Sequence, residues 1–119
     1  MTANGSPDPP DFRIEVTRAG ERTIVAVAGE IDVATAGEFQ SAVREQLAQA
    51  PVLLDLRALT FMDSSGVHAL DAIMRDCERE RWELAIDADL PDQVRRVLEL
   101  TGLLSALPLQ ESAVGEERT

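Results

Sequence analysis

The sequence predicts an α/β fold, in which a mixed β-sheet of four to five strands is packed by three or four α-helices. Two observations favour this class. Two consecutive strand patterns open the chain, and helix and strand patterns then alternate along it. A length of 119 residues with 45% hydrophobic content suits one compact domain. The initial pair of strands supplies the antiparallel part of the sheet.

An N-terminal β-hairpin begins the predicted fold. Residues 12–17 alternate apolar and polar side chains, which is typical of an edge strand with one face toward water. Residues 23–28 are apolar on both faces, as expected for a strand deeper in the sheet. A turn near Ala19 and Gly20 joins the two strands.

A first helix and a central strand follow the hairpin. From Ala36 onward, apolar residues recur at helical spacing, and the pattern ends near Ala50. Pro51 then precedes a short continuous apolar run over residues 52–56. A run of this kind suits a strand that is covered on both sides, so we expect residues 52–56 to form a central strand.

The second half of the chain repeats the helix and strand patterns. Residues 67–79 trace one apolar helix face, and residues 82–86 alternate as a fourth strand. Pro91 suits the start of a third helix, which Gly102 is placed to cap. The apolar residues 103–109 fit either a last short strand or an irregular apolar cover, and the sequence does not decide between them.

Composition divides the chain into a domain and two polar ends. Residues 1–11 are polar and contain three prolines, and the chain becomes small, polar and acidic from Gln110. We therefore expect a disordered segment over residues 1–11, one domain over residues 12–109 and a flexible acidic tail over residues 110–119.

Charge and cysteine content exclude several classes of protein. The 22 acidic and 11 basic residues give a net charge of −11, which would repel nucleic acid and anionic membrane surfaces. The single cysteine, Cys77, lies in an apolar helix pattern and is expected to be a small buried hydrophobe. No apolar run suits a signal peptide or a membrane span, so we expect a cytoplasmic protein.

The candidate functional motif is the turn Asp63–Gly66, which joins the central strand to the second helix. Serine is favoured at a helix N-terminus because its hydroxyl can accept a hydrogen bond from a free amide, so Ser64 and Ser65 can be simple caps. Two adjacent hydroxyls beside Asp63 exceed what a cap requires. A phosphate there would be tolerated by the helix dipole, and its charge beside Asp63 and an already acidic surface would disfavour any partner that packs closely there. The turn therefore has the chemistry of a phosphorylation switch.

Three segments carry a resemblance to a known family. The stretch Leu54–Val67 resembles the signature of bacterial anti-sigma factor antagonists of the STAS domain family. Gly29–Asp32 is similar to the second landmark of that family, and Pro91–Leu98 followed by Thr101–Leu103 is similar to the third. The resemblance spans residues 12–109 and implies a STAS-like mixed sheet with helices, in agreement with the hydrophobic patterns.

The resemblance also implies a function and a mechanism. In this family the unmodified antagonist binds an anti-sigma factor, which then releases its sigma factor. The anti-sigma factor is also a serine kinase that phosphorylates the antagonist and ends the interaction, and a separate serine phosphatase restores it. The family's phosphorylated serine directly follows the aspartate and carries over to Ser64. The residues alone do not separate Ser64 from Ser65, which stays the second choice.

The expected partner-binding surface surrounds this serine. It consists of Asp32, Asp63, Ser64, Ser65, Gly66, Val67 and His68. For Asp32 and Asp63 a purely local role is open, since either carboxylate can bond backbone amides in a turn. His68 stands where many relatives have a small residue, and we expect it to be exposed or to face the partner.

We expect the chain to be a substrate of an enzyme and not an enzyme. It has no Gly-rich phosphate loop and no lysine, so the kinase must bring the ATP, and no cofactor is expected. One histidine and one cysteine cannot build a familiar zinc site. Two alternatives remain open: an unphosphorylated STAS scaffold or ligand-binding module in a signalling complex, and a serine hydrolase using Ser64 and His68. The hydrolase lacks a Gly-x-Ser-x-Gly elbow and an orienting acid.

Overall fold

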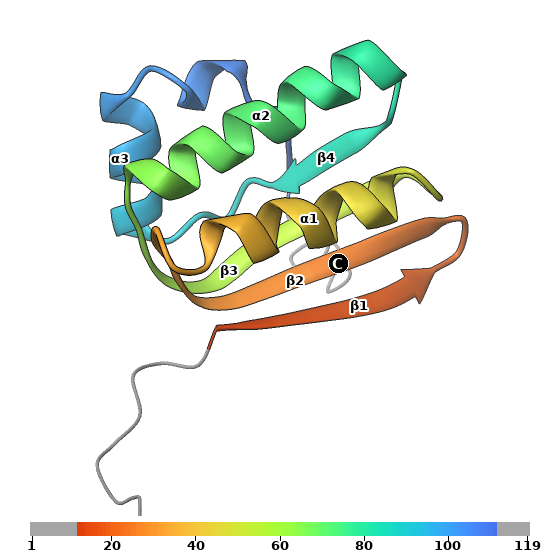
Figure 1. Ribbon diagram of the computed structural model, residues 1–119, viewed down its shortest axis with the longest axis horizontal. Helices are drawn as coiled ribbons and strands as arrows, with labels where there is room; N and C mark the ends of the chain where they lie inside the picture. The colour runs from red at the N-terminus through yellow and green to blue at the C-terminus, as the bar shows by residue number, and fades with distance from the viewer. Residues whose placement is uncertain (1–11, 112–119) are drawn as a thin grey trace, which may run out of the picture.

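The computed structural model describes residues 12–111, which form a five-stranded sheet, three α-helices and one turn of 3-10 helix (Figure 1). The strands are β1 (Arg13–Ala19), β2 (Arg22–Ile31), β3 (Val52–Met62), β4 (Leu84–Asp87) and β5 (Leu109–Gln110). The helices are α1 (Ala36–Leu47), α2 (Ser64–Glu80), α3 (Asp92–Leu100) and the 3-10 helix η1 (Leu104–Ala106). The predicted α/β class, with a mixed sheet and an N-terminal hairpin, is confirmed.

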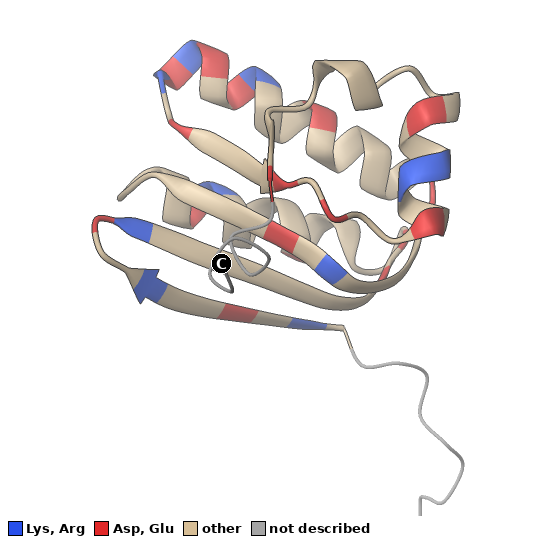
Figure 2. Ribbon diagram, turned by 180° about the vertical axis from the view of Figure 1, so that it is seen from behind, with Lys and Arg blue, Asp and Glu red and all other residues tan. Residues whose placement is uncertain are grey.

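The strand order in the sheet follows the chain, β1-β2-β3-β4-β5. β1 pairs antiparallel with β2, and every other neighbouring pair is parallel. β1 therefore lies at an edge and β3 in the centre, as predicted. Figures 1 and 2 view the molecule from opposite sides and show the three α-helices on one side of the sheet. The parallel connections bring the ends of β2 and β3 together, with Ile31 opposite Met62.

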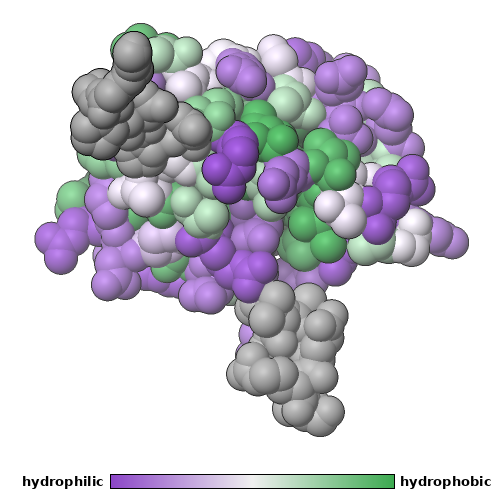
Figure 3. All heavy atoms as spheres, turned by 90° about the horizontal axis from the view of Figure 1, so that it is seen from below, coloured by the Kyte–Doolittle hydropathy of each residue, from purple (hydrophilic) through white to green (hydrophobic). Residues whose placement is uncertain are grey.

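One hydrophobic core lies between the sheet and the helices. Its largest fully buried side chains include Phe39 of α1, Leu54 of β3 and Leu70 of α2. At the outer edge, β1 is mostly exposed, and Val16 retains 46% of its accessible surface. Figure 3 shows the face on the β1 side as a mixture of hydrophilic and hydrophobic residues. The core is thus built mainly on β2 and β3.

β3 is longer than the central strand predicted over residues 52–56, and it continues as far as Met62. Two irregularities in the pairing with β2 explain the difference. Ala26 and Ala28 pair with Asp55 and Ala58, and Gly29 and Glu30 pair with Leu59 and Phe61, so β3 carries one extra residue at each place. After Leu56, the buried residues are therefore three positions apart, at Leu59 and Met62. A strand with a burial period of three is not recognised by a search for alternating apolar and polar residues.

The C-terminal apolar segment contains the short strand that its sequence allowed, preceded by a turn of 3-10 helix that was not predicted. Residues 104–106 form η1, and Leu109 and Gln110 pair in parallel with β4 as the short strand β5. Gly102 has φ +81°, and the amide of Leu103 donates to the carbonyl of Leu98 at 3.0 Å. Gly102 thus ends α3 in the left-handed conformation expected of a capping glycine.

The two polar ends predicted from composition fall almost wholly outside the described residues. Residues 1–11 lie outside them, and so do residues 112–119 of the predicted tail. Gln110, where that tail was expected to begin, is part of the sheet. Within residues 12–111, no helix has the length and apolar content needed to cross a membrane.

Candidate functional site

The turn after β3 places Ser64 at the first position of α2. Asp63 is the N-cap residue, and its Oδ1 accepts hydrogen bonds from the amides of Ser65 at 2.8 Å and Gly66 at 3.4 Å. The capping role that the sequence allowed for the serines is therefore taken by Asp63. Ser64 is exposed and Ser65 is half-buried. Among the described residues, no side-chain hydrogen bond occupies the Ser64 hydroxyl.

The loop after β2 lies directly beside this turn. The amide of Asp63 donates to the carbonyl of Ile31 at 3.1 Å, which joins the ends of the two strands. In the neighbouring loop, Asp32 Oδ1 accepts from the amide of Ala34 at 2.9 Å. Asp32 and Asp63 thus come from adjacent strand ends. Each carboxylate also has a local backbone partner.

A side chain of α3 completes the support of the turn. Gln93 Oε1 accepts from the amide of Met62 at 2.9 Å, and Gln93 Nε2 donates to the carbonyl of Met62 at 3.0 Å. Met62 is fully buried and immediately precedes Asp63. Sequence patterns did not single out Gln93 for the site, because a polar residue in a first helical turn is usually solvated. Its place beside Pro91 in the third family landmark was the available signal.

The predicted partner-binding residues divide into a surface and a support. Ser64 and His68 are exposed, and Asp32, Asp63 and Ser65 are half-buried. Gly66 and Val67 are buried, so they lie beneath that surface and do not form part of it.

Gly66 is buried because α2 packs closely on the ends of β2 and β3. A Cβ atom at Gly66 would lie 2.6 Å from Met62 Cγ and 3.0 Å from Ile31 Cγ2. The first separation is shorter than real contacts of a Cβ atom and the second is tighter than most of them, so the packing favours glycine at this position. Gly66 therefore sets how near the helix carrying Ser64 approaches the sheet.

His68 follows Ser64 by one helical turn. Within residues 12–111, no hydrogen bond joins the two side chains, and no acid holds the imidazole in place. The arrangement lacks the oriented base that an activated serine nucleophile needs. No group of three or more potential metal ligands occurs in this part of the chain.

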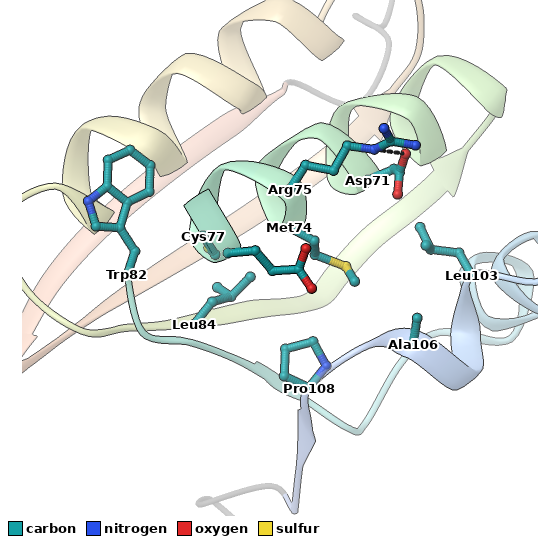
Figure 4. Close-up of a pocket in the computed structure, with 10 residues that line it drawn as sticks. Asp71, Met74, Arg75, Cys77, Trp82, Leu84, Leu103, Ala106 and Pro108 are labelled. Atoms are coloured by element: carbon teal, nitrogen blue, oxygen red, sulfur yellow. Dashed lines mark hydrogen bonds and ion pairs between the residues drawn. The ribbon is translucent and has the colours of Figure 1, made fainter. Parts of the chain in front are cut away.

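A cavity of about 390 Å³ lies elsewhere, between α2, β4 and the segment containing η1 (Figure 4). Met74, Cys77 and Leu84 contribute to its apolar wall, and Asp71 and Arg75 form an ion pair of 3.0 Å beside it. None of the residues of the Asp63–Gly66 turn lines this cavity. Burial, aided by the charge of Asp76, raises the pKa of the Cys77 thiol, which favours the unreactive protonated form.

The electrostatic cluster nearest to the middle of β3 joins two strands. Arg57 donates to both carboxylate oxygens of Asp55, with Nε–Oδ1 at 2.9 Å and Nη2–Oδ2 at 3.0 Å. Its Nε also lies 3.9 Å from Oδ2 of the buried Asp87 on β4. Burial of Asp55 acts to raise the pKa of its carboxyl, but the hydrogen bonds from Arg57 outweigh burial and hold that pKa below its usual value.

One protein family and several known proteins are similar to this chain. The family model described as STAS domain matches residues 13–114. An anti-sigma F factor antagonist of Paenibacillus polymyxa is 26% identical over 107 residues, which cover 87% of this chain and 91% of the relative. The crystal structure of an anti-sigma factor antagonist from Mycobacterium paratuberculosis has a TM-score of 0.75 and 28% identity, covering 88% of this chain and 90% of its own.

The same fold occurs in SpoIIAA, an anti-sigma factor antagonist whose structure has been solved in two states. The unphosphorylated form has a TM-score of 0.67 at 22% identity, covering 90% of this chain and 92% of its own. The phosphorylated form, described as a Bacillus cell fate determinant, has a TM-score of 0.63 at 22% identity, covering 90% of this chain and 96% of its own. At this level of identity the similarity concerns the fold.

Proposed function

Because this chain belongs to the STAS domain family, we propose that it is an anti-sigma factor antagonist switched off by phosphorylation of Ser64. In its unmodified form it binds an anti-sigma factor serine kinase and thereby releases a sigma factor. The kinase brings the ATP and transfers its phosphate to Ser64, and a serine phosphatase removes it. The chain acts in the cytoplasm as a substrate of these enzymes and catalyses neither step. The relatives named as anti-sigma factor antagonists support this assignment.

Two observations support Ser64 over Ser65 as the phosphorylated residue. Asp63 caps α2 through the amides of Ser65 and Gly66, so the fold does not need the Ser64 hydroxyl as a cap. Ser64 is also the more exposed of the two serines, which suits a residue that must enter the active site of a kinase. Ser65 stays the second choice because it lies in the same helical turn.

The charge at the turn explains how a phosphate would end the interaction. A phosphoserine carries about −1.5 to −2 charges at neutral pH. The amides at the start of α2 tolerate that charge, so the fold itself is preserved. A partner packed against the turn would have to accommodate the new charge beside Asp32 and Asp63. Burial of a charge that has no compensating partner at an interface costs several kcal/mol, which changes affinity about a hundredfold or more.

Two linked experiments test the proposal. In a pull-down from the organism that encodes the chain, wild type and Ser64→Ala should retain an anti-sigma factor serine kinase, and Ser64→Asp should not. Ser105→Asp adds the same charge to an exposed serine of η1 and is the matched control, which should bind as wild type. With that purified kinase and labelled ATP, wild type and Ser65→Ala should take up phosphate and Ser64→Ala should not.

The outcomes separate the proposal from its alternatives. Equal phosphate uptake by wild type and Ser64→Ala would move the switch to Ser65 or another residue. No uptake by any variant, together with unchanged binding of Ser64→Asp, would indicate an unphosphorylated STAS scaffold. Hydrolysis of an ester substrate that depends on both Ser64 and His68 would indicate an enzyme.

A further inference from the structure

Val33 presents an apolar side chain to water beside the proposed switch. It is 82% exposed, the highest value among the large hydrophobic residues that the structure describes. Single exposed apolar residues are common on protein surfaces, so exposure alone decides nothing. The position of Val33, the rigidity of its loop and the charge around it are what distinguish it.

The loop that carries Val33 lies next to Ser64. Val33 follows Ile31 by two residues, and the carbonyl of Ile31 accepts from the amide of Asp63 at 3.1 Å. Ser64 is the residue after Asp63. The two loops therefore leave adjacent strand ends, and a partner that covers Ser64 also reaches Val33.

Hydrogen bonds fix the backbone on both sides of Val33. The Thr35 hydroxyl donates to the carbonyl of Glu30 at 2.9 Å and accepts from the amide of Asp32 at 3.0 Å. Asp32 Oδ1 accepts from the amide of Ala34. A loop held in this way loses little conformational entropy when a partner binds it. Val33 is thus a preorganised apolar contact.

The two segments that carry Val33 and Ser64 are acidic. Residues 30–38 and 61–71 contain no arginine or lysine, and His68 is the only side chain in them that can carry a positive charge. The carboxylates in these two segments are Glu30, Asp32, Glu38, Asp63 and Asp71. A complementary partner surface is therefore basic around the position that Val33 occupies.

We infer that Val33 is the apolar anchor of the partner-binding surface, and that the kinase receives it in an apolar recess bordered by basic side chains. The inference rests on the proposed function and deepens it. Burial of a valine side chain accounts for about a tenfold gain in affinity. The basic border adds an attraction that salt screens, so it contributes mainly to the rate of association.

Binding of the purified anti-sigma factor serine kinase to unphosphorylated variants tests this inference. Val33→Ser should bind about tenfold more weakly than wild type, and Val33→Leu should bind within about threefold of it. Val16→Ser is the matched control, because Val16 is an exposed valine on β1, and it should bind as wild type. Association of the wild type should slow as salt is added.

The outcomes keep the inference separate from the proposed function. Since Val33 is exposed, Val33→Ser should unfold at the same urea concentration as wild type, so weaker binding would report the contact. Full affinity of Val33→Ser, or an association rate independent of salt, overturns the inference. If wild type binds and Ser64→Asp does not, the proposed function stands in either case. If wild type does not bind the kinase, the proposed function itself fails.

Discussion

The side-chain amide of Gln93 pairs with both backbone polar atoms of Met62, donating to the carbonyl and accepting from the amide. β4 pairs with β3 over Val52–Leu54 and ends at Asp87, so within residues 12–111 no strand lies beside Met62 on that side. Gln93 therefore supplies the two hydrogen bonds that a neighbouring strand would supply. Through them, α3 holds the last residue of β3 before the turn Asp63–Gly66.

Gln93→Ala should destabilise the fold by about 2 kcal/mol, because it leaves two buried backbone groups of Met62 without partners. Gln93→Glu should recover only part of the loss, since a carboxylate accepts from the amide and cannot donate to the carbonyl. Urea unfolding measures both. Gln49→Ala is the control: the Gln49 side chain bonds Glu45 on an exposed surface, so the change should be within about 0.5 kcal/mol. Equal effects of Gln93→Ala and Gln49→Ala would contradict the role of Gln93.

Gly66→Ala should lower the free energy of unfolding by about 1 kcal/mol, although alanine favours helix. The added methyl would meet Met62 Cγ and Ile31 Cγ2, and overpacking of this kind costs about 1–3 kcal/mol. Gly37→Ala in α1 is the matched control, since nothing lies within 4 Å of its Cβ position. It should stabilise the protein by up to about 1 kcal/mol through helix propensity alone. Thermal unfolding of the pair should therefore give shifts of opposite sign.

Asp63→Ala should destabilise the protein by about 1 kcal/mol through loss of the N-cap of α2. Asp63→Asn keeps an oxygen that can accept from Ser65 and Gly66, so it should lose only the interaction of the charge with the helix dipole, about 0.3–1 kcal/mol. Asp92→Ala is the control, because Asp92 lies in the first turn of α3, where no side chain caps the helix. Were Asp63→Asn as damaging as Asp63→Ala, capping by the side-chain oxygen would be excluded.

Arg57→Met should destabilise the protein by roughly 1 kcal/mol at neutral pH, and this difference from wild type should shrink as the pH falls below about 4. Arg57 holds the pKa of Asp55 below its ordinary value of 3.8, so the pair stabilises the fold while Asp55 is ionised. That contribution is fully present above the unfolded pKa and is lost as the pH falls through the lower folded pKa. Urea unfolding at a series of pH values measures it. Arg75→Met removes an exposed pair with Asp71 and should show little effect at any pH.

Strand and helix patterns predicted the fold because most of its elements keep one period throughout. β2 contains a continuous apolar run over residues 23–28, and α2 buries a continuous helical face, so both were found from hydrophobicity alone. The second half of β3 was missed because its bulges change the burial period from two to three.

The candidate site was predicted less completely than the fold. The turn Asp63–Gly66 could be located because serines before a helical pattern mark a helix start. Asp63 and the two serines were all possible caps, and the sequence does not choose between adjacent residues of these types. That Gln93 holds Met62 depends on a contact between residues 31 positions apart. Hydrogen bonds over such separations leave no periodic pattern in the chain.

The two bulges in β3 also determine which changes in chain length this segment can accept. Each extra residue has no partner of its own on β2, and Met62 lies opposite Ile31 beyond both bulges. Deleting one extra residue would remove its bulge and leave Met62 opposite Ile31, and deleting both would straighten the strand with the same result. A deletion elsewhere in the paired part of β3 would instead shift the pairing by one residue and turn Met62 to the other face. Homologous proteins should therefore vary in length at the two bulges, one residue at a time.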